Sequence, residues 1–205
     1  MTDSIFTPND CELVKRELLG QGRFLTLARY HLRHRLFSGE WSEIYPCEML
    51  ERYSAAAVLP YDPKLDRVIL IEQFRAGSIH NKETAWLIEI PAGVITDNIS
   101  PEDTARHETI EEAGCTLLSL APICEYYVSP GGSNEYLHLY CGIVDASSAG
   151  GIHGLASEHE NIRVLNLSSD EAFAKLRAGE IKTSPAIISL LWLQSNRDRL
   201  KEIGG

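Results

Sequence analysis

The sequence contains no uninterrupted apolar run long enough to cross a membrane. Its strongest apolar stretch, AIISLLWL at residues 186–193, is far shorter than the roughly 20 residues that a spanning helix needs. Residues 1–10 also lack the basic start and the apolar centre of a secretory signal. We therefore expect a cytoplasmic protein that makes no contact with membranes.

Positive charge is scarce. The 205 residues include 19 Lys and Arg against 29 Asp and Glu, which gives a formal net charge of −10. A chain with this excess of negative charge has no general attraction for nucleic acid or for anionic lipid. An anionic substrate would therefore need a local basic group or a metal ion.

Paired cysteines are missing as well. The five cysteines are widely spaced and never form a CxxC pair: Cys11, Cys47, Cys115, Cys124 and Cys141. An odd number at such spacing argues against both a disulfide framework and a zinc site. We expect reduced and mostly buried thiols.

The patterns that are present predict an α+β fold with one main core and a small appendage. Two strands with an SGEW turn between them are expected within residues 24–53, where they would form a small sheet of their own. An apolar run follows at residues 54–61, and further strands are expected at residues 67–75, 85–95 (broken by Pro91 and Gly93), 117–128, 135–144 and 162–167. In the strand at 67–75, residues 68 and 70 should face opposite to residues 69 and 71.

Three helices are marked by their end signals. Ser100 suits an N-cap and Gly114 suits a C-terminal stop, which predicts a helix between them. Ser168 and Glu171 form a capping box for a helix that ends near residue 179. A last amphipathic helix should start at Ser184 and run to about residue 195.

The predicted first helix contains three closely spaced acids. Glu108, Glu111 and Glu112 stand at i, i+3 and i+4, so their carboxylates share one face. Like charges at this spacing destabilise a helix, and no Lys or Arg follows them within one turn to offset the charge. Either the face is simply solvated, or a hard cation such as Mg²⁺ or Mn²⁺ balances the carboxylates.

The frame around these acids resembles the signature of the Nudix hydrolase family. That signature is G-x5-E-x7-R-E-U-x-E-E-x-G-U, with U apolar, and residues 93–115 are GVITDNISPEDTARHETIEEAGC. The glycines and the last three acids match. Three positions depart from it: Ile99 replaces an acid, His107 replaces an arginine thought to orient a catalytic glutamate, and Thr109 replaces an apolar residue.

Further segments are similar to the bacterial Nudix enzymes that hydrolyse ADP-ribose. They include RHRLFSGEW, AAAVLPYDP, VILIEQFR, IPAGVI, SPGGSNE and GIHGLASEHENIRV, and together they cover most of residues 23–167. This resemblance implies a Nudix fold, with a mixed β-sheet sandwiched between helices and a small N-terminal antiparallel sheet. It also implies a β subdomain at 1–53 that dimerises, a hydrolase domain at 54–205, and a homodimer with exchanged N-terminal sheets.

The resemblance also assigns roles to individual residues. The implied Mg²⁺ ligands, with Mn²⁺ as an alternative metal, are Ala92 through its carbonyl, Glu108, Glu111, Glu112 and Glu160. The implied catalytic residues are Glu158 as base, Glu112 and Glu108; His159 is an alternative base because its ordinary pKa suits the task. The implied substrate-binding residues are Phe24, Glu48, Arg52, Arg75, Val94, Ser129, Gly131 and Glu135.

Several of these assignments have ordinary structural alternatives. Arg75 could form a salt bridge, Phe24 could be a core aromatic, SPGG could be a surface turn, and SEHEN at 157–161 an exposed loop. Cys47 stands where the similar enzymes have an arginine. The substrate could therefore contain a nucleobase other than adenine, as in hydrolysis of GDP-mannose. The third alternative is a non-catalytic domain that senses ADP-ribose, but residues 168–205 are too few and not basic enough for a DNA-binding domain.

Overall fold

The computed structural model describes residues 6–22, 25–96 and 98–204. These residues divide into two compact units. One comprises Met1–Tyr53 with Tyr127–Glu135, and the other comprises Ser54–Tyr126 with Tyr136–Gly205.

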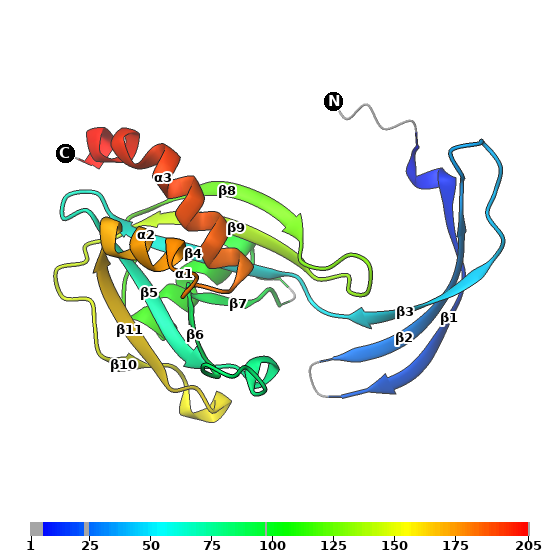
Figure 1. Ribbon diagram of the computed structural model, residues 1–205, viewed down its shortest axis with the longest axis horizontal. Coiled ribbons are helices and arrows are strands. Elements are labelled where there is room, and N and C mark those ends of the chain that lie inside the picture. The colour runs from blue at the N-terminus through cyan, green and yellow to red at the C-terminus, as the bar shows by residue number, and fades with distance from the viewer. Residues whose placement is uncertain (1–5, 23–24, 97, 205) are drawn as a thin grey trace. The chain divides into compact units, whose positions relative to one another are not determined.

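The first unit contains an antiparallel sheet of three strands, in the order β1-β2-β3 (Figure 1). These are β1 (Cys11–Gln21), β2 (Thr26–His34) and β3 (Tyr45–Glu51), and a short 3-10 helix, η1 (Pro8–Asp10), precedes them. The expected small antiparallel sheet is therefore confirmed. Sequence reasoning missed β1, because nearly all its residues are exposed and two register shifts against β2 disturb any alternation of apolar and polar residues.

The second unit is built on a mixed sheet of eight strands. Six form the path β10-β11-β5-β4-β9-β8, while β6 pairs with β5 and β7 pairs with β4. The bounds are β4 (Ala55–Asp62), β5 (Arg67–Phe74), β6 (Trp86–Glu89), β7 (Ala92–Val94), β8 (Ser119–Tyr127), β9 (Tyr136–Ile143), β10 (Ile152–His153) and β11 (Ile162–Ser168). The pairing of β4 with β9 is parallel, which makes the sheet mixed.

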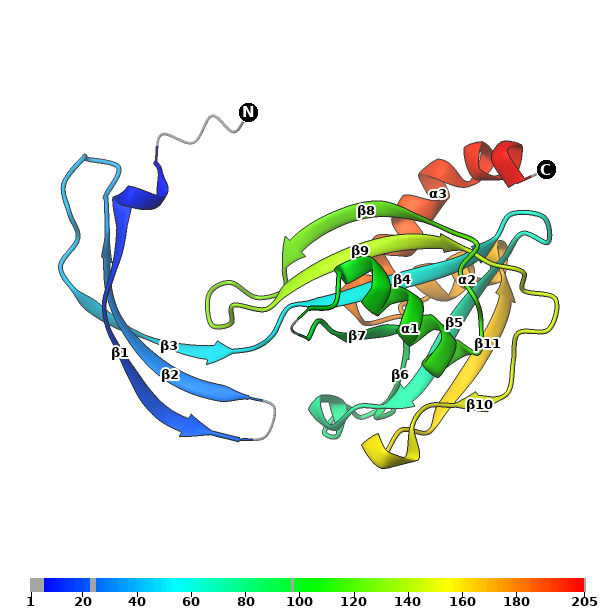
Figure 2. The ribbon, with the colours of Figure 1, turned by 180° about the vertical axis from the view of Figure 1, so that it is seen from behind.

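Helices cover both faces of this sheet. Helix α1 (Pro101–Ala113) lies on one face, and α2 (Ser169–Arg177) and α3 (Ser184–Gly204) lie on the other (Figures 1 and 2). Strand β5 contributes to both cores: Val68 and Leu70 pack on the α2 and α3 side, whereas Ile69 and Ile71 pack on the α1 side. The predicted sheet between helices and the predicted alternation along β5 are confirmed.

The helix signals were accurate at most ends. Ser100 Oγ accepts the Asp103 N–H at 3.0 Å, and Gly114 ends α1 with a left-handed φ of 65°. The capping box of Ser168 and Glu171 is present at the start of α2. However, α3 runs nine residues beyond the expected end at residue 195, because its polar last turns are held by ion pairs from Arg197 and Lys201 to Asp66.

All five cysteines lie within the described residues and are free thiols. The expectation that most are buried is wrong, since only Cys115 and Cys141 are buried, while Cys11 and Cys124 are exposed. Within the described part of the chain, no helix combines the length and the apolar character needed to span a bilayer.

Candidate active site

The acidic face of α1 is partly buried within the second unit. Glu112 is only 2% exposed, whereas Glu111, one residue earlier, is exposed. The Ala92 N–H, on β7, donates to Glu112 Oε2 at 2.8 Å. The structure therefore places one predicted ligand carboxylate directly beside the backbone of another predicted ligand residue.

Strand β7 also approaches Glu108 closely. A Cβ atom added to Gly93 would lie 1.7 Å from Glu108 Oε1 and 2.1 Å from Cδ, far closer than non-bonded atoms approach one another. Gly93 is therefore required at this position because a side chain would displace the Glu108 carboxylate. Gly93, which opens the signature, and Glu108 therefore pack directly against each other.

The loop after β10 brings further acids to the same region. It contains a 3-10 turn, η3 (Ala156–Glu158), and the Glu160 side chain, whose Oε2 accepts the Leu155 N–H at 3.0 Å. Burial raises the pKa of Glu108 to about 7, and the charges of three neighbouring carboxylates add to the rise. These neighbours are Glu111 on the helix and Glu160 and Glu158 on the loop.

Glu112 experiences the same negative field. Burial raises its pKa to about 8 against the lowering effect of the Ala92 N–H, and the charges of Glu108 and Glu160 act in the same direction as burial. Arg75 opposes the rise. Two carboxylates that are both hard to ionise next to one another create a place where added positive charge is strongly favoured.

Arg75, at the end of β5, is paired with Glu89 on β6. Its Nη2 and Nε donate to Glu89 Oε2 at 2.8 Å and 3.1 Å, and Gln73 donates to the same oxygen at 3.3 Å. Burial lowers the pKa of Arg75, but the hydrogen bonds and charge of Glu89 outweigh that effect and raise it. The salt bridge that was the structural alternative for Arg75 is therefore present.

Two of the three positions that depart from the signature lie toward solvent, whereas Thr109 is buried and its Oγ1 donates to the Ala105 carbonyl at 2.7 Å. His107 is exposed on α1, and Ile99, 37% exposed, directly precedes the N-cap. His159, the alternative base, is exposed and has a left-handed φ of 60°. Val94, a predicted substrate contact at the end of β7, is 49% exposed.

Most of the remaining predicted substrate residues lie together in the first unit. Arg52 Nη1 lies 3.0 Å from Glu135 Oε2, and the Ser129 carbonyl accepts the Gly132 N–H at 3.1 Å, in the turn that contains exposed Gly131. The Leu50 N–H of β3 donates to the Gly132 carbonyl at 2.8 Å, which fixes this turn to the strand. Glu48, also on β3, is paired with Arg29 at 3.2 Å. Phe24 lies outside the described residues.

The donor set suits a divalent cation, although the carboxylates are not yet arranged as ligands. Among the described residues, no three His, Cys, Asp or Glu side chains form a ready-made metal-binding group. Glu112 Oε2 accepts the Ala92 N–H at 2.8 Å. Since Mg²⁺ is usually held by one or two carboxylates together with water and substrate phosphates, a complete set of protein ligands is not required.

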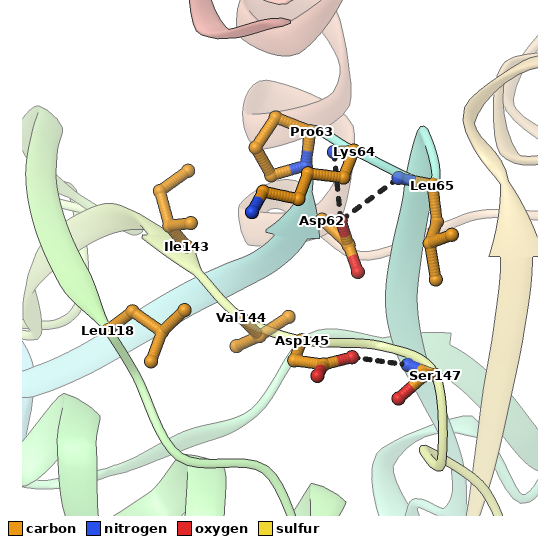
Figure 3. Close-up of a pocket in the computed structure, with 9 residues that line it drawn as sticks. All are labelled: Asp62, Pro63, Lys64, Leu65, Leu118, Ile143, Val144, Asp145 and Ser147. Carbon is orange, nitrogen blue, oxygen red and sulfur yellow. Dashed lines mark hydrogen bonds between the residues drawn. The ribbon is translucent and has the colours of Figure 1, made fainter. Parts of the chain in front are cut away.

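A cavity of about 430 Å³ lies elsewhere in the second unit (Figure 3). Its walls come from the β4–β5 turn, from Leu118 and from the chain that follows β9. Asp62, at its edge, uses both carboxylate oxygens to accept backbone N–H groups, those of Lys64, Leu65 and Ala146. None of the predicted site residues lines this cavity.

Two residues near the acids were missed in the sequence. Glu89 is an acid at the end of a short apolar strand, WLIE, and this contrast was a usable signal. His153 packs against Gly114, where an added Cβ would lie 2.4 Å from its Cε1. No local pattern could have revealed this contact, because the two residues are far apart in the sequence.

Comparison with known proteins agrees with this arrangement. The NUDIX domain matches residues 50–186. An ADP-ribose pyrophosphatase of Escherichia coli (strain K12) is 44% identical over 196 residues, which cover 96% of this chain and 93% of that protein. One from Haemophilus influenzae is 40% identical over 200 residues, with 96% and 92% covered. A GDP-mannose pyrophosphatase of Escherichia coli (strain SMS-3-5 / SECEC) is 34% identical over 154 residues, with 73% and 78% covered. The predicted family and the predicted enzyme class, a hydrolase, are thus confirmed, and the chain belongs to the Nudix family.

Proposed function

We propose that this enzyme hydrolyses the diphosphate bond of ADP-ribose to AMP and ribose 5-phosphate, with Mg²⁺ as the metal and Mn²⁺ as a substitute. The observation that supports this most directly is the cluster of Glu108, Glu112, Glu158 and Glu160 beside Ala92 in a Nudix chain. Similarity to the ADP-ribose pyrophosphatases extends over nearly the whole chain and exceeds similarity to the GDP-mannose enzymes.

Nudix hydrolases generally need a divalent metal ion, and the acidic cluster fits one. Glu108, Glu112 and the Ala92 carbonyl would hold it, supported by Glu111 and Glu160. When bound, the metal would neutralise the diphosphate and make a bound water easier to deprotonate. The buried carboxylates favour this binding because their mutual repulsion is relieved by a cation.

The residues of the chain then have separate tasks. Glu158 accepts the proton of the attacking water, since it is exposed on its loop and is free of the helix packing that holds Glu112. Arg75, held by Glu89, contacts a phosphate oxygen with the guanidinium N–H groups that Glu89 leaves available. Arg52, Glu135 and the turn at 129–132 bind the nucleotide or the terminal ribose.

The first unit supports the proposal of a homodimer. Cross-strand neighbours share a face of a sheet, so the registers divide this sheet into an apolar and a charged face. The mainly apolar face has Leu13, Leu18, Ala28, Tyr30, Leu32, Tyr45, Cys47 and Met49, and it also contains the ion pair of Arg16 with Glu51. Leu13 and Leu18 are 51% and 55% exposed in the single chain, an exposure that a second copy would remove. Light scattering that finds a monomer at micromolar concentration would contradict the homodimer.

Glu112→Gln tests the catalytic site. We expect kcat for ADP-ribose to fall at least about 10²-fold, because a carboxylate that holds the metal is lost. The fold should persist, because glutamine can still accept the Ala92 N–H and carries no buried charge. Glu102→Gln, an exposed acid in the first turn of the same helix, is the matched control and should keep full activity. Full activity in excess EDTA, or of the Glu112→Gln variant, contradicts the proposal.

The substrate is tested by phosphate release, coupled to a phosphatase, over a panel. The panel contains ADP-ribose, ADP-glucose, GDP-mannose, NADH and diadenosine polyphosphates. We expect the highest kcat/KM for ADP-ribose. A preference for GDP-mannose would contradict ADP-ribose as the substrate. It would agree with the presence of Cys47 where the similar enzymes have an arginine. Tight binding of ADP-ribose without turnover would instead indicate a sensor.

A further inference from the structure

The segment before the acidic loop is attached to the end of α1 at two points. Backbone pairing makes β10 an antiparallel partner of β11, with Ile152 opposite Arg163 and His153 opposite Ile162. From this position the His153 ring lies on Gly114, the residue that ends α1. Gly114 thus has two requirements that exclude a side chain, its left-handed φ of 65° and the imidazole above its Cα.

The first attachment is the ring itself. His153 Nε2 lies 2.8 Å from the Gly150 carbonyl oxygen, so this nitrogen is the donor and the ring orientation is fixed. The hydrogen bond closes the turn from Gly150 to His153, in which Gly151 has a left-handed φ of 92°. The imidazole is therefore held from one side by its own turn and from the other by the helix end.

The second attachment is a backbone hydrogen bond. The Gly154 N–H donates to the Glu111 carbonyl at 3.1 Å. That carbonyl belongs to the last turn of α1, where carbonyl groups have no partner within the helix. The bond joins the residue that follows His153 to the helix turn that contains Glu111 and Glu112.

Beyond this point the chain mainly contacts itself. Glu158 N–H and Glu160 N–H both donate to the Leu155 carbonyl, at 2.9 Å and 3.2 Å, and Glu160 Oε2 accepts the Leu155 N–H. At its other end the loop continues into β11, which pairs with β5, and the Val164 N–H donates to the Gly151 carbonyl at 3.0 Å. Residues 153 and 154 attach the start of the loop to the end of α1.

We propose that His153 is a positioning residue, which fixes the loop of residues 154–160, with Glu158 and Glu160, against the C-terminal end of the helix that contains Glu108 and Glu112. This inference rests on the proposed function, because the loop matters for turnover only if Glu158 acts on the water. Without the imidazole, the turn at 150–153 loses its closing hydrogen bond and the helix end loses its cover. A displacement of the base by about 1 Å is enough to reduce turnover about 10²-fold.

The variants His153→Ala and His153→Phe test this in the full chain. His153→Ala removes both the ring and the donor, and we expect kcat to fall about 10- to 100-fold with KM for ADP-ribose changed less than about threefold. His153→Phe keeps a ring over Gly114 but cannot donate to Gly150, so its kcat should lie between that of His153→Ala and wild type. His80→Ala, at an exposed histidine in the same unit, is the control.

A double-mutant cycle with Glu158→Gln separates positioning from general destabilisation. If His153 acts through Glu158, His153→Ala should lower kcat less than about threefold further in the Glu158→Gln background, because coupled sites are not additive. Equal losses in both backgrounds would overturn the proposal. So would a kcat for His153→Ala within twofold of wild type.

Hydrogen exchange followed by mass spectrometry provides a readout that does not depend on activity. In His153→Ala, residues 150–160 should exchange faster while residues 101–113 keep their wild-type protection. Unchanged exchange at 150–160 would overturn the positioning role. If wild type fails to hydrolyse ADP-ribose, the proposed function fails, but the exchange result still decides whether His153 holds the loop.

Discussion

Replacing Gly93 by alanine isolates the contact between β7 and the first acid of the helix. The φ of Gly93 lies outside the left-handed region, so alanine is allowed by the backbone and the effect is steric. The new Cβ would lie 1.7 Å from Glu108 Oε1. Ordinary contacts need about 3.5 Å, so the carboxylate must retreat by roughly 1.5–2 Å.

A displacement of this size should be far more damaging to activity than to stability. A misplacement of about 1 Å can cost about 10²-fold in rate, so we expect kcat for ADP-ribose to fall about 10²- to 10³-fold. The Glu108 side chain is only partly buried and can rotate toward solvent, so the free energy of unfolding should fall by no more than about 1–2 kcal/mol. Phosphate release measures the first quantity and urea denaturation the second.

Two further variants test whether the effect of Gly93→Ala acts through Glu108. Gly20→Ala, where an added Cβ meets nothing within 4 Å, should leave kcat unchanged. Glu108→Ala removes the three atoms that the new Cβ would meet, Oε1, Cδ and Cγ, so Gly93→Ala should have little further effect in that background. If Gly93→Ala keeps kcat within threefold of wild type, or if its loss is the same in the Glu108→Ala background, the packing of Glu108 on Gly93 does not position the carboxylate.

Two predictions concern stability. Burial disfavours ionisation of Asp66, but hydrogen bonds led by that from Arg197 outweigh it and hold the pKa of Asp66 well below its ordinary value. Asp66→Asn, which still tolerates the left-handed φ of 54°, should lower the free energy of unfolding by about 1–3 kcal/mol at pH 7 in urea titrations. Because the folded pKa is depressed, this stabilisation is present above the unfolded pKa of about 4 and is lost below it. The difference in the free energy of unfolding between wild type and Asp66→Asn should therefore become smaller as pH falls below about 4. A difference that becomes larger there would contradict the lowered pKa of Asp66. Ser189 Oγ is fully buried with no hydrogen-bond partner among the described residues, so Ser189→Ala should raise the free energy of unfolding by about 1 kcal/mol, and a thermal midpoint below wild type would show that the hydroxyl has a partner.

The limits of sequence reasoning are clearest at the two ends of the chain. Strand β1 was missed because neither of its faces is buried within the unit, so no alternation marks it. The last turns of α3 were missed because their polar sequence lacks an apolar stripe, and ion pairs to Asp66, more than a hundred residues earlier, hold them. In both cases the decisive contacts are absent from any local window of sequence.

The sequence by itself determined the family, the helix that contains Glu108, Glu111 and Glu112, and the caps of that helix. These features depend on spacings of three to fourteen residues and on capping residues that bind the neighbouring backbone. It placed Glu108 and Glu112 on one helix, but the alternative of a solvated face stayed open. Only the tertiary structure showed that Glu112 does not lie on a solvated face, since it is buried against β7, and burial and the charge of Glu160 on the loop at 154–160 raise its pKa. Pairing of β7 with β4 and of β10 with β11 brings these segments together, and such pairing depends on contacts between residues distant in the chain.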